Sequence, residues 1–427
     1  MFESFLVRAF LKKHGFASRM VTDEILSDMY ARRPAAGGMD MSRTWMLPPE
    51  KNPADEKVIV IDAGGTNFRS CLVSFDKNGC AEISELQKNF MPATERVYSK
   101  EEFFSAVADR IEYLKDKSDK IGFCFSYSVD MTPEHDAIPN AFSKEFKARS
   151  ILGLPVGKNL VEELEKRGWN KIKKISVVND TVCALLAGKT AVPAADSYIG
   201  FILGTGMNAA FIAPAENEWD SEKKEQIIVC ESGKCNTVPW SDFDRDADTR
   251  TVVPVQFPFE KCCSGAYLGN VCLSILQFAA REGLFGKETA ENLLELKSLS
   301  TINCDDFLYI YNEKKKDSAA EKKFLQGCLK TERDRKIAFL LLDSAVDRVA
   351  HYSASLLAAN LIACGKGKSP DKKVCIVCNG TTFYKTFRLK ERIQKYLSDF
   401  VAEKGLYFEL VKVENDITTG AAVAALI

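Results

Sequence analysis

The sequence predicts an α/β protein with two lobes and a cleft between them, and three stretches predict it. In 58–69, four β-branched apolar residues lead into Asp62, two glycines and a second apolar run. The stretch 198–212 repeats this pattern, with a Gly-Thr-Gly turn between two apolar runs. Between them, the apolar run 175–178 ends in Asn179 and Asp180. Polar groups at strand ends are where α/β sheets place ligand sites.

Both predicted hairpin turns suit a phosphate group. Gly64 and Gly65 allow positive φ angles and a close approach to the backbone, while Thr66 and Asn67 add a hydroxyl and an amide. Backbone N–H groups beside an acid are typical of sites for a Mg²⁺-bound phosphate. The first turn is not a P-loop, because no Gly-Lys-Ser/Thr follows and the next element is a strand. A plain β-turn is the alternative for this hairpin alone, and the second copy favours phosphate binding.

Composition excludes several classes of protein. The chain has 427 residues, enough for two domains or one large α/β unit. Its 58 basic and 59 acidic residues leave a formal charge of −1, so no general basic field would attract nucleic acid. No apolar run approaches the length of a membrane span, and we expect none. Fourteen cysteines without regular spacing indicate a reducing, cytoplasmic setting, and three widely separated histidines argue against a His-based metal or nucleophilic site.

The remaining segments are expected to be structural. Residues 1–37 predict two helices, with Phe2 and Phe5 on the core-facing side of the first; a transit peptide is the less favoured alternative. Apolar residues at helical spacing predict a core-facing helix over 100–114. We expect 130–140 to be a mobile polar loop and 242–248 an acidic loop.

Two cysteine pairs and the last long segments complete the expectations. Cys375 and Cys378 have redox or metal spacing but lie in an apolar run, so we expect buried structural thiols. Cys262 and Cys263 would be oxidation-sensitive only if a cleft lay nearby. A long helix is expected to begin near residue 259, and another to span 334–364.

The two hairpins and the Asn-Asp strand end carry a resemblance. The chain resembles the eukaryotic-type hexokinases from about Met46 to Ala422. This resemblance implies an α/β, two-domain, actin-like ATPase (ribonuclease H-like) fold with a cleft between a small and a large lobe. The expected division is N-terminal helices over 1–56, a small lobe over 57–190 and a large lobe over 191–427.

The residues and the resemblance together predict the site. Asp180, at a strand end, is the candidate base for the sugar 6-hydroxyl, and an Asx turn is its structural alternative. Lys144 lies in 141–148, which resembles the family's sugar-contacting Trp-Thr-Lys-Gly-Phe-Lys segment with Glu145 in place of Gly. Arg69 is expected either to stabilise the transferring phosphoryl group or to pair with an acid. The sugar would be held by short polar groups: Ser126, Ser143, Lys144, Asn179, Asp180, Asn208, Glu231 and Glu260.

ATP would bind with Mg²⁺ at the two hairpins. Asp62 is expected to orient the ion through water, and a strand end near residue 379, where Asn replaces the family's Asp, is expected to hold the nucleoside. The expected ATP-binding residues are Asp62, Gly64, Gly65, Thr66, Asn67, Gly204, Thr205, Gly380 and Thr381.

The expected function is ATP-dependent phosphorylation of a hexose, with glucose as the leading substrate, at the first step of glycolysis. The expected partners are hexose and ATP, in a monomer or dimer, with no nucleic acid or membrane. A non-catalytic sugar sensor is the main alternative, against which stands the intact set Lys144, Asp180 and Thr205. Bacterial repressor/kinases would need a Cys-rich zinc site with a nearby His, which the sequence lacks. A chaperone or filament ATPase is disfavoured, because Asn179, Asp180 and the two glutamates suit a sugar.

Overall fold

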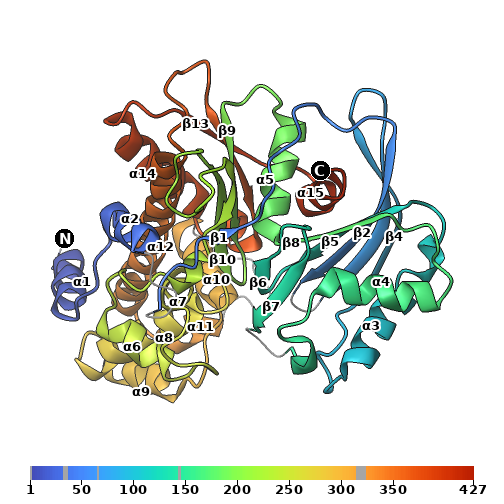
Figure 1. The fold of residues 1–427 in the computed structure, drawn as a ribbon. Helices are drawn as coiled ribbons and strands as arrows, with labels where there is room; N and C mark the ends of the chain where they lie inside the picture. The colour runs from blue at the N-terminus through green and yellow to red at the C-terminus, as the bar shows by residue number, and fades with distance from the viewer. Residues whose placement is uncertain (1, 32–36, 65–66, 143–145, 314–323) are drawn as a thin grey trace.

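Two β-sheets form the centres of two lobes (Figure 1). The structure is a computed structural model that describes residues 2–31, 37–64, 67–142, 146–313 and 324–427. The first sheet has the strand order β4-β3-β2-β5-β8 and the second β1-β11-β10-β9-β12-β13. Two-domain α/β architecture of this kind confirms the predicted fold class.

The first hairpin lies at the middle of the five-stranded sheet. Strands β2 and β3 pair antiparallel from Glu56 opposite Phe75 to Gly64 opposite Asn67, and β2 also pairs parallel with β5. Apolar residues on both faces of β2 are fully buried, as expected of a central strand. The strands are β2 Glu56–Gly64, β3 Asn67–Phe75, β4 Ala81–Phe90, β5 Lys120–Phe125 and β8 Lys174–Val178.

The second sheet repeats the arrangement of the first. Its hairpin β9–β10 is antiparallel and β9 pairs parallel with β12, just as β2 pairs with β3 and β5. The predicted second copy of the hairpin is therefore confirmed. The two turns occupy equivalent positions, each at the end of the central strand of its own sheet. The strands are β1 Ser42–Arg43, β9 Ser197–Leu203, β10 Met207–Ala213, β11 Gln226–Val229, β12 Val374–Asn379 and β13 Phe408–Val411.

Helices cover the outer faces of both sheets. In the first lobe, α3 Lys100–Asp109 buries Phe103, Phe104 and Val107, as its spacing predicts. In the second lobe, the 33-residue helix α12 Glu332–Cys364 contacts both α14 and α2. The other helices outside the interface are α1 Phe2–Lys13, α2 Thr22–Tyr30, α4 Val156–Lys166, α6 Asp242–Asp248, α7 Pro258–Cys263, α8 Leu268–Arg281, α9 Lys287–Glu295, α10 Thr301–Glu313, α11 Phe324–Cys328, α13 Thr381–Lys385 and α14 Leu389–Ala402.

Two helices lie between the sheets and touch main chain to main chain. Helix α5 Asp180–Ala191 follows β8, and α15 Asp416–Ala424 follows β13 (Figure 1). A Cβ atom at Gly420 of α15 would lie 1.8 Å from the Cys183 carbonyl oxygen of α5. On the other side of α5, a Cβ at Gly200 of β9 would lie 2.0 Å from the Thr181 carbonyl oxygen. Both contacts require glycine because any side chain would displace the helix.

This contact makes Gly420→Ala destabilising although alanine favours helices. The gain in helix propensity is at most about 1 kcal/mol, whereas overpacking against backbone costs about 1–3 kcal/mol. We expect the midpoint of urea unfolding to fall. Gly327→Ala in α11 is the control, because a Cβ there meets nothing within 4 Å. An unchanged or raised midpoint for Gly420→Ala would contradict the close packing of α5 and α15.

The apolar clusters assign α15 to the first lobe. Ala421, Ala422 and Val423 are buried together with residues of β2, β5 and α5. We therefore propose a division in which the small lobe consists of 57–190 together with α15, and the large lobe of 191–415 with the N-terminal helices packed on it.

Two segments expected to be loops are regular elements. Residues 130–140 lie largely in a two-stranded hairpin, β6 Ser128–Met131 and β7 Ala137–Ala141. Residues 242–248 form α6, because Ser241 and Asp244 make a capping box that satisfies its first N–H groups. The acidic composition concealed this helix, although two of its acids, Asp242 and Asp244, lie in the first turn, where they are favourable.

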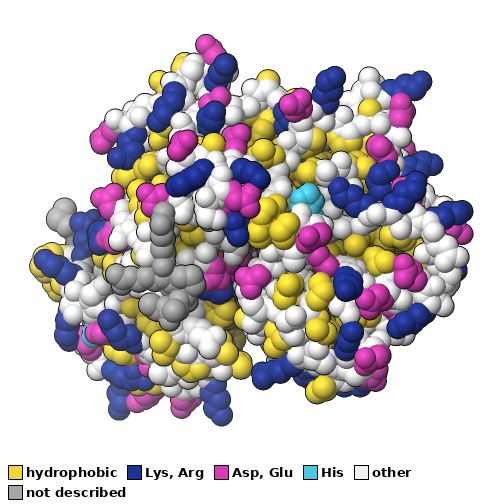
Figure 2. Space-filling view, in the orientation of Figure 1, with side chains coloured by type: hydrophobic (Ala, Val, Ile, Leu, Met, Phe, Trp, Pro, Cys, Tyr) yellow, Lys and Arg dark blue, Asp and Glu magenta, His cyan; other side chains and the backbone are white. Residues whose placement is uncertain are grey.

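Other details of the expectation were also wrong. Phe2 and Phe5 are 67% and 72% exposed; of the apolar face expected for α1, Phe10 is buried, together with Val7 and Leu11. The helix expected to begin near 259 is interrupted between α7 and α8. In the part of the chain that the structure describes, no helix combines the length and apolar character needed to cross a membrane. Acidic and basic side chains are interspersed over the face in Figure 2.

Candidate active site

The first hairpin presents an acid and a cation side by side. The register of β2 and β3 places Asp62 opposite Arg69, and Arg69 Nη1 donates to Asp62 Oδ2 at 3.1 Å. Burial raises the pKa of Asp62, and the Arg69 guanidinium offsets part of that rise. Of the two expected roles of Arg69, pairing with an acid is the one seen here; contact with a phosphoryl group stays a prediction. Asp62 is a nearly buried carboxylate whose charge a bound cation would favour, so it fits a Mg²⁺ site.

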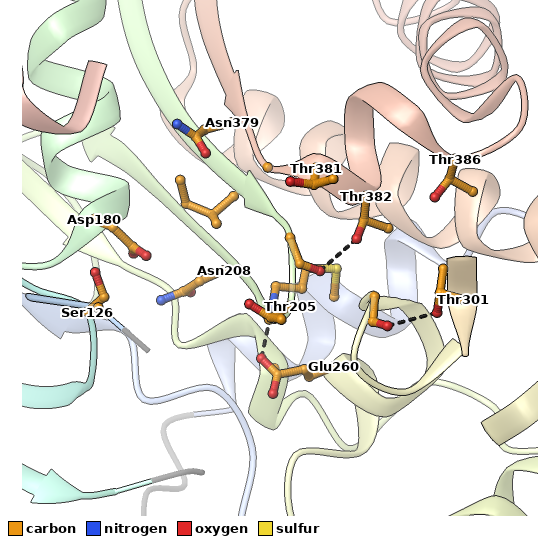
Figure 3. Close-up of a pocket in the computed structure, with 18 of the residues that line it drawn as sticks. Ser126, Asp180, Thr205, Asn208, Glu260, Thr301, Asn379, Thr381, Thr382 and Thr386 are labelled. Atoms are coloured by element: carbon orange, nitrogen blue, oxygen red, sulfur yellow. Dashed lines mark hydrogen bonds between the residues drawn. The ribbon is translucent and has the colours of Figure 1, made fainter. Parts of the chain in front are cut away.

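Asp180 is placed by the capping of α5. Asn179 is the N-cap: its Oδ1 accepts from the backbone N–H of Thr181 at 2.9 Å and from the Thr181 hydroxyl at 2.6 Å. Asp180 is the first residue of the helix, where the helix dipole favours a negative charge. Because the neighbouring asparagine makes the cap, the Asp180 side chain lines the cavity beside Ser126 (Figure 3).

The second lobe contributes two glutamates. Glu260, in α7, accepts from the backbone N–H of Met207 at 3.0 Å, so it is fixed beside the second hairpin. Asn208 Nδ2 donates to Glu231 Oε1 at 3.2 Å. Glu231 has a positive φ of 52°, an uncommon conformation for this residue type that turns the chain sharply into the site. Burial raises the pKa of Glu231 to about 7.

The end of β9 and the start of α13 meet around Gly204. Thr382 Oγ1 donates to the Gly204 carbonyl at 2.8 Å (Figure 3). The Gly265 N–H donates to the same oxygen at 2.8 Å. Beside them, Asn379 Nδ2 donates to both carboxylate oxygens of Asp416, at 2.7 and 2.8 Å. Burial raises the pKa of Asp416, and Asp62 adds to that rise. Asn379 thus holds an acid that lies near the first hairpin.

A single cavity of about 860 Å³ brings most of the predicted site together. Asn179 does not line it, because its side chain caps α5. Gly65, Thr66, Ser143 and Lys144, together with Glu145, lie outside the described residues. The predicted residues that do line it are Asp62, Gly64, Asn67, Arg69, Ser126, Asp180, Gly204, Thr205, Asn208, Glu231, Glu260, Gly380 and Thr381.

Sequence reasoning missed two groups of lining residues. The first is Thr301, Asp305 and Tyr309 on α10, where the Tyr309 hydroxyl donates to the Lys385 carbonyl of α13 at 3.3 Å. They lie within 283–330, a stretch whose pattern predicts only a charged helical region, so nothing in it pointed to a site. Burial raises the pKa of Asp305 to about 6, although it accepts from the Phe387 N–H at 3.1 Å. The second group is Ser128 and Lys234, which lie near Glu231.

Comparison with known proteins agrees with this geometry. Two family models, each described as hexokinase, match residues 15–190 and 198–427. The chain belongs to the hexokinase family. Hexokinase-1 of Schizosaccharomyces pombe is 27% identical over 95% of this chain and 86% of its own length. Hexokinase-2 of Candida albicans is 28% identical over 95% of this chain and 88% of its own length.

Solved hexokinase structures share the fold. A hexokinase from Schistosoma mansoni complexed with glucose superposes with a TM-score of 0.79 at 22% identity, covering 100% of this chain and 99% of that one. A further hexokinase crystal structure has a TM-score of 0.74 at 21% identity, with 100% and 96% coverage. The two-lobed hexokinase fold predicted from the hairpins is therefore confirmed.

Proposed function

We propose that this chain transfers the γ-phosphoryl group of Mg-ATP to the 6-hydroxyl of a hexose, with glucose as the expected substrate. The observation that carries the proposal is the single cavity that holds Asp180, both glutamates and both hairpins. Phosphoryl transfer requires in-line positioning, neutralised phosphate charge and a base for the attacking hydroxyl. Membership of the hexokinase family supports the same reaction.

In this proposal the sugar binds between the lobes. Glu231, Glu260 and Asn208 form hydrogen bonds with its hydroxyls from the large lobe, and Ser126, Ser143 and Lys144 are expected to do so from the small lobe. Asn179 acts indirectly, by capping the helix that begins at Asp180. A sugar that lacks one of these hydroxyls would leave buried polar groups of the protein unpaired. This cost is the source of selectivity among sugars. Asp180 accepts the proton of the 6-hydroxyl as that oxygen attacks phosphorus.

ATP is proposed to bind across the two hairpins. Backbone N–H groups at Gly64, Gly65 and Thr205 would hold the phosphates, with the side chains of Thr66 and Asn67, while Gly380 and Thr381 would flank the nucleoside. The Gly204 N–H donates to the Gly206 carbonyl at 2.9 Å, so Gly204 would instead shape the turn beside the phosphates. Bound Mg²⁺ supplies charge neutralisation to the phosphates, and Asp62 would orient it through water. Closure of the lobes on the sugar would exclude water that could otherwise accept the phosphoryl group.

We also propose a cytoplasmic location and small-molecule partners only. All fourteen cysteines are free thiols, which fits a reducing compartment. Cys262, Cys263, Cys375 and Cys378 are buried, and burial raises the pKa of each thiol, so a structural role is proposed for them.

A coupled assay of ADP release tests the function. We expect turnover with Mg-ATP that depends on sugar across a panel of glucose, mannose, fructose, glucosamine and N-acetylmannosamine. The ranking of sugars tests glucose as the preferred substrate. Sugar binding by calorimetry without any turnover would instead support the sugar sensor.

A further inference from the structure

Lys234 lies in the sugar end of the cavity, although no motif pointed to it. It is the last residue of the single 3₁₀ turn Ser232–Lys234, which begins directly after Glu231. The Lys234 N–H donates to the Glu231 carbonyl at 3.0 Å, so the turn is tight. Both side chains line the cavity. The turn therefore brings an ammonium group back toward the carboxylate that precedes it.

The contacts of Lys234 join the two lobes. Its Nζ forms an ion pair with Asp40, in the segment before β1, and donates to Ser128 Oγ at 3.2 Å. Ser128 belongs to β6 of the small lobe, and its hydroxyl lowers the pKa of Glu231, as the Lys234 ammonium does. Lys234 and Ser128 thus both favour the charged form of the Glu231 carboxyl. Because the Lys234 side chain is only 22% exposed, solvent screens this interaction less than at the surface.

Glu231 needs such a cation. Burial raises its pKa to about 7, the Lys234 charge lowers it and the Asp40 charge raises it. Glu260 of α7 and Asp180 of α5 line the same cavity and add no positive charge. Burial also raises the pKa of the neighbouring Cys230 thiol, which stays neutral. Arg69 and Lys385 also line the described part of the cavity, but Arg69 is paired with Asp62, and Lys234 is the cation whose charge lowers the pKa of Glu231.

We propose that Lys234 is a positioning residue that holds Glu231 ionised and oriented for the sugar. The inference rests on the proposed function, in which Glu231 accepts hydrogen bonds from sugar hydroxyls. An ionised carboxylate accepts stronger hydrogen bonds than a protonated one. Glucose affinity should then fall as the pH falls through the pKa of Glu231.

Opposite pH shifts in two variants test the proposal. Glucose binding is measured by calorimetry without ATP, from about two pH units below 7 to about one unit above. In Lys234→Met the midpoint of the acid loss of affinity should move to higher pH, and in Asp40→Asn it should move to lower pH. If the midpoint moves up by one pH unit, glucose affinity at a pH below the midpoint falls about tenfold. Lys234→Arg should restore the wild-type midpoint.

A purely structural ion pair predicts something different. Because Lys234→Met and Asp40→Asn break the same pair, a structural role would move both midpoints in the same direction or neither, and either result would overturn the proposal. Loss of binding at every pH in both Lys234→Met and Lys234→Arg would also contradict it, since arginine keeps the charge. Lys224→Met, at a lysine that is 71% exposed, is the control for losing a cation and should leave the midpoint unchanged.

The outcome is separable from that of the proposed function. Suppose that the wild-type protein binds glucose and the midpoints of the two variants shift in opposite directions, but no ADP is released. That result would contradict the kinase activity and support the role of Lys234. Sugar-dependent turnover with midpoints that do not move would support the activity and reject Lys234 as a positioning residue.

Discussion

Replacing Asp180 with alanine lowers kcat by about 10²- to 10⁴-fold and leaves glucose binding nearly unchanged. The magnitude is that of a lost general base, with a further contribution from lost orientation of the hydroxyl. The helix should persist, because Asn179 makes the N-cap and Thr181 donates to it without help from Asp180. Steady-state ADP release at saturating glucose and Mg-ATP measures kcat, and calorimetry measures the sugar affinity.

Two comparisons make this result specific. Asp180→Asn keeps the size and polarity of the side chain but not its basicity, so it should lose nearly as much kcat as alanine does. Thr190→Ala, near the far end of α5 and away from the cavity, is a control for changing this helix. Near-normal turnover in Asp180→Ala would remove Asp180 from the mechanism and favour a role limited to the start of the helix.

Replacing Arg348 with methionine destabilises the protein by about 3–5 kcal/mol. Arg348 of α12 and Asp244 of α6 form a fully buried bidentate pair, with N–O distances of 2.6 and 2.7 Å. Burial acts to raise the pKa of Asp244, but Arg348 and the Ser241 cap together hold that pKa below its ordinary value. Without the guanidinium, the variant has a buried carboxylate whose charge is not compensated. The midpoint of urea unfolding at neutral pH measures the loss.

A double variant separates the pair from packing. Asp244→Asn removes the charge while keeping a group that can bond to Ser241, so adding it to Arg348→Met should recover part of the loss. The stabilisation by the wild-type pair is present above the unfolded-state pKa of Asp244 and is lost as the pH falls through its lowered folded-state pKa. Equal destabilisation by the single and double variants would show that Arg348 acts through packing against Phe16 and Tyr352.

The parts of the fold that were predictable have strong local patterns. Both hairpins, the buried strand of Cys375 and Cys378, and α12 follow from apolar runs and helical periodicity. The two apolar hairpin patterns were enough to locate the two sheets. Most of the predicted site residues that the structure describes line one cavity, because the hairpin turns and strand ends of the two sheets face the same space.

What could not be predicted depends on tertiary contacts. The exposure of Phe2 and Phe5 reflects where α1 docks, which its periodicity does not determine. The helix α6 exists because a capping box outweighs an acidic composition that otherwise indicates a loop. Lys234 reaches the site through a turn at a positive φ of Glu231, a conformation that a glutamate gives no reason to expect. Thr301 and Asp305 join the site only because α10 packs beside α13 and the loop that follows it.

The main-chain contact between α5 of the small lobe and β9 of the large lobe, at Gly200, has a consequence for how the lobes move. Interfaces made by interlocking side chains must change rotamers before one element can turn against another, which makes them bistable. At Gly200 no side chain interlocks with α5, so a small rotation of the large lobe about this helix requires no rotamer change there. Asp180 is at the start of the same helix, close to such an axis, where a rotation displaces atoms least. The candidate base would therefore stay in place while the two glutamates of the other lobe move toward the sugar.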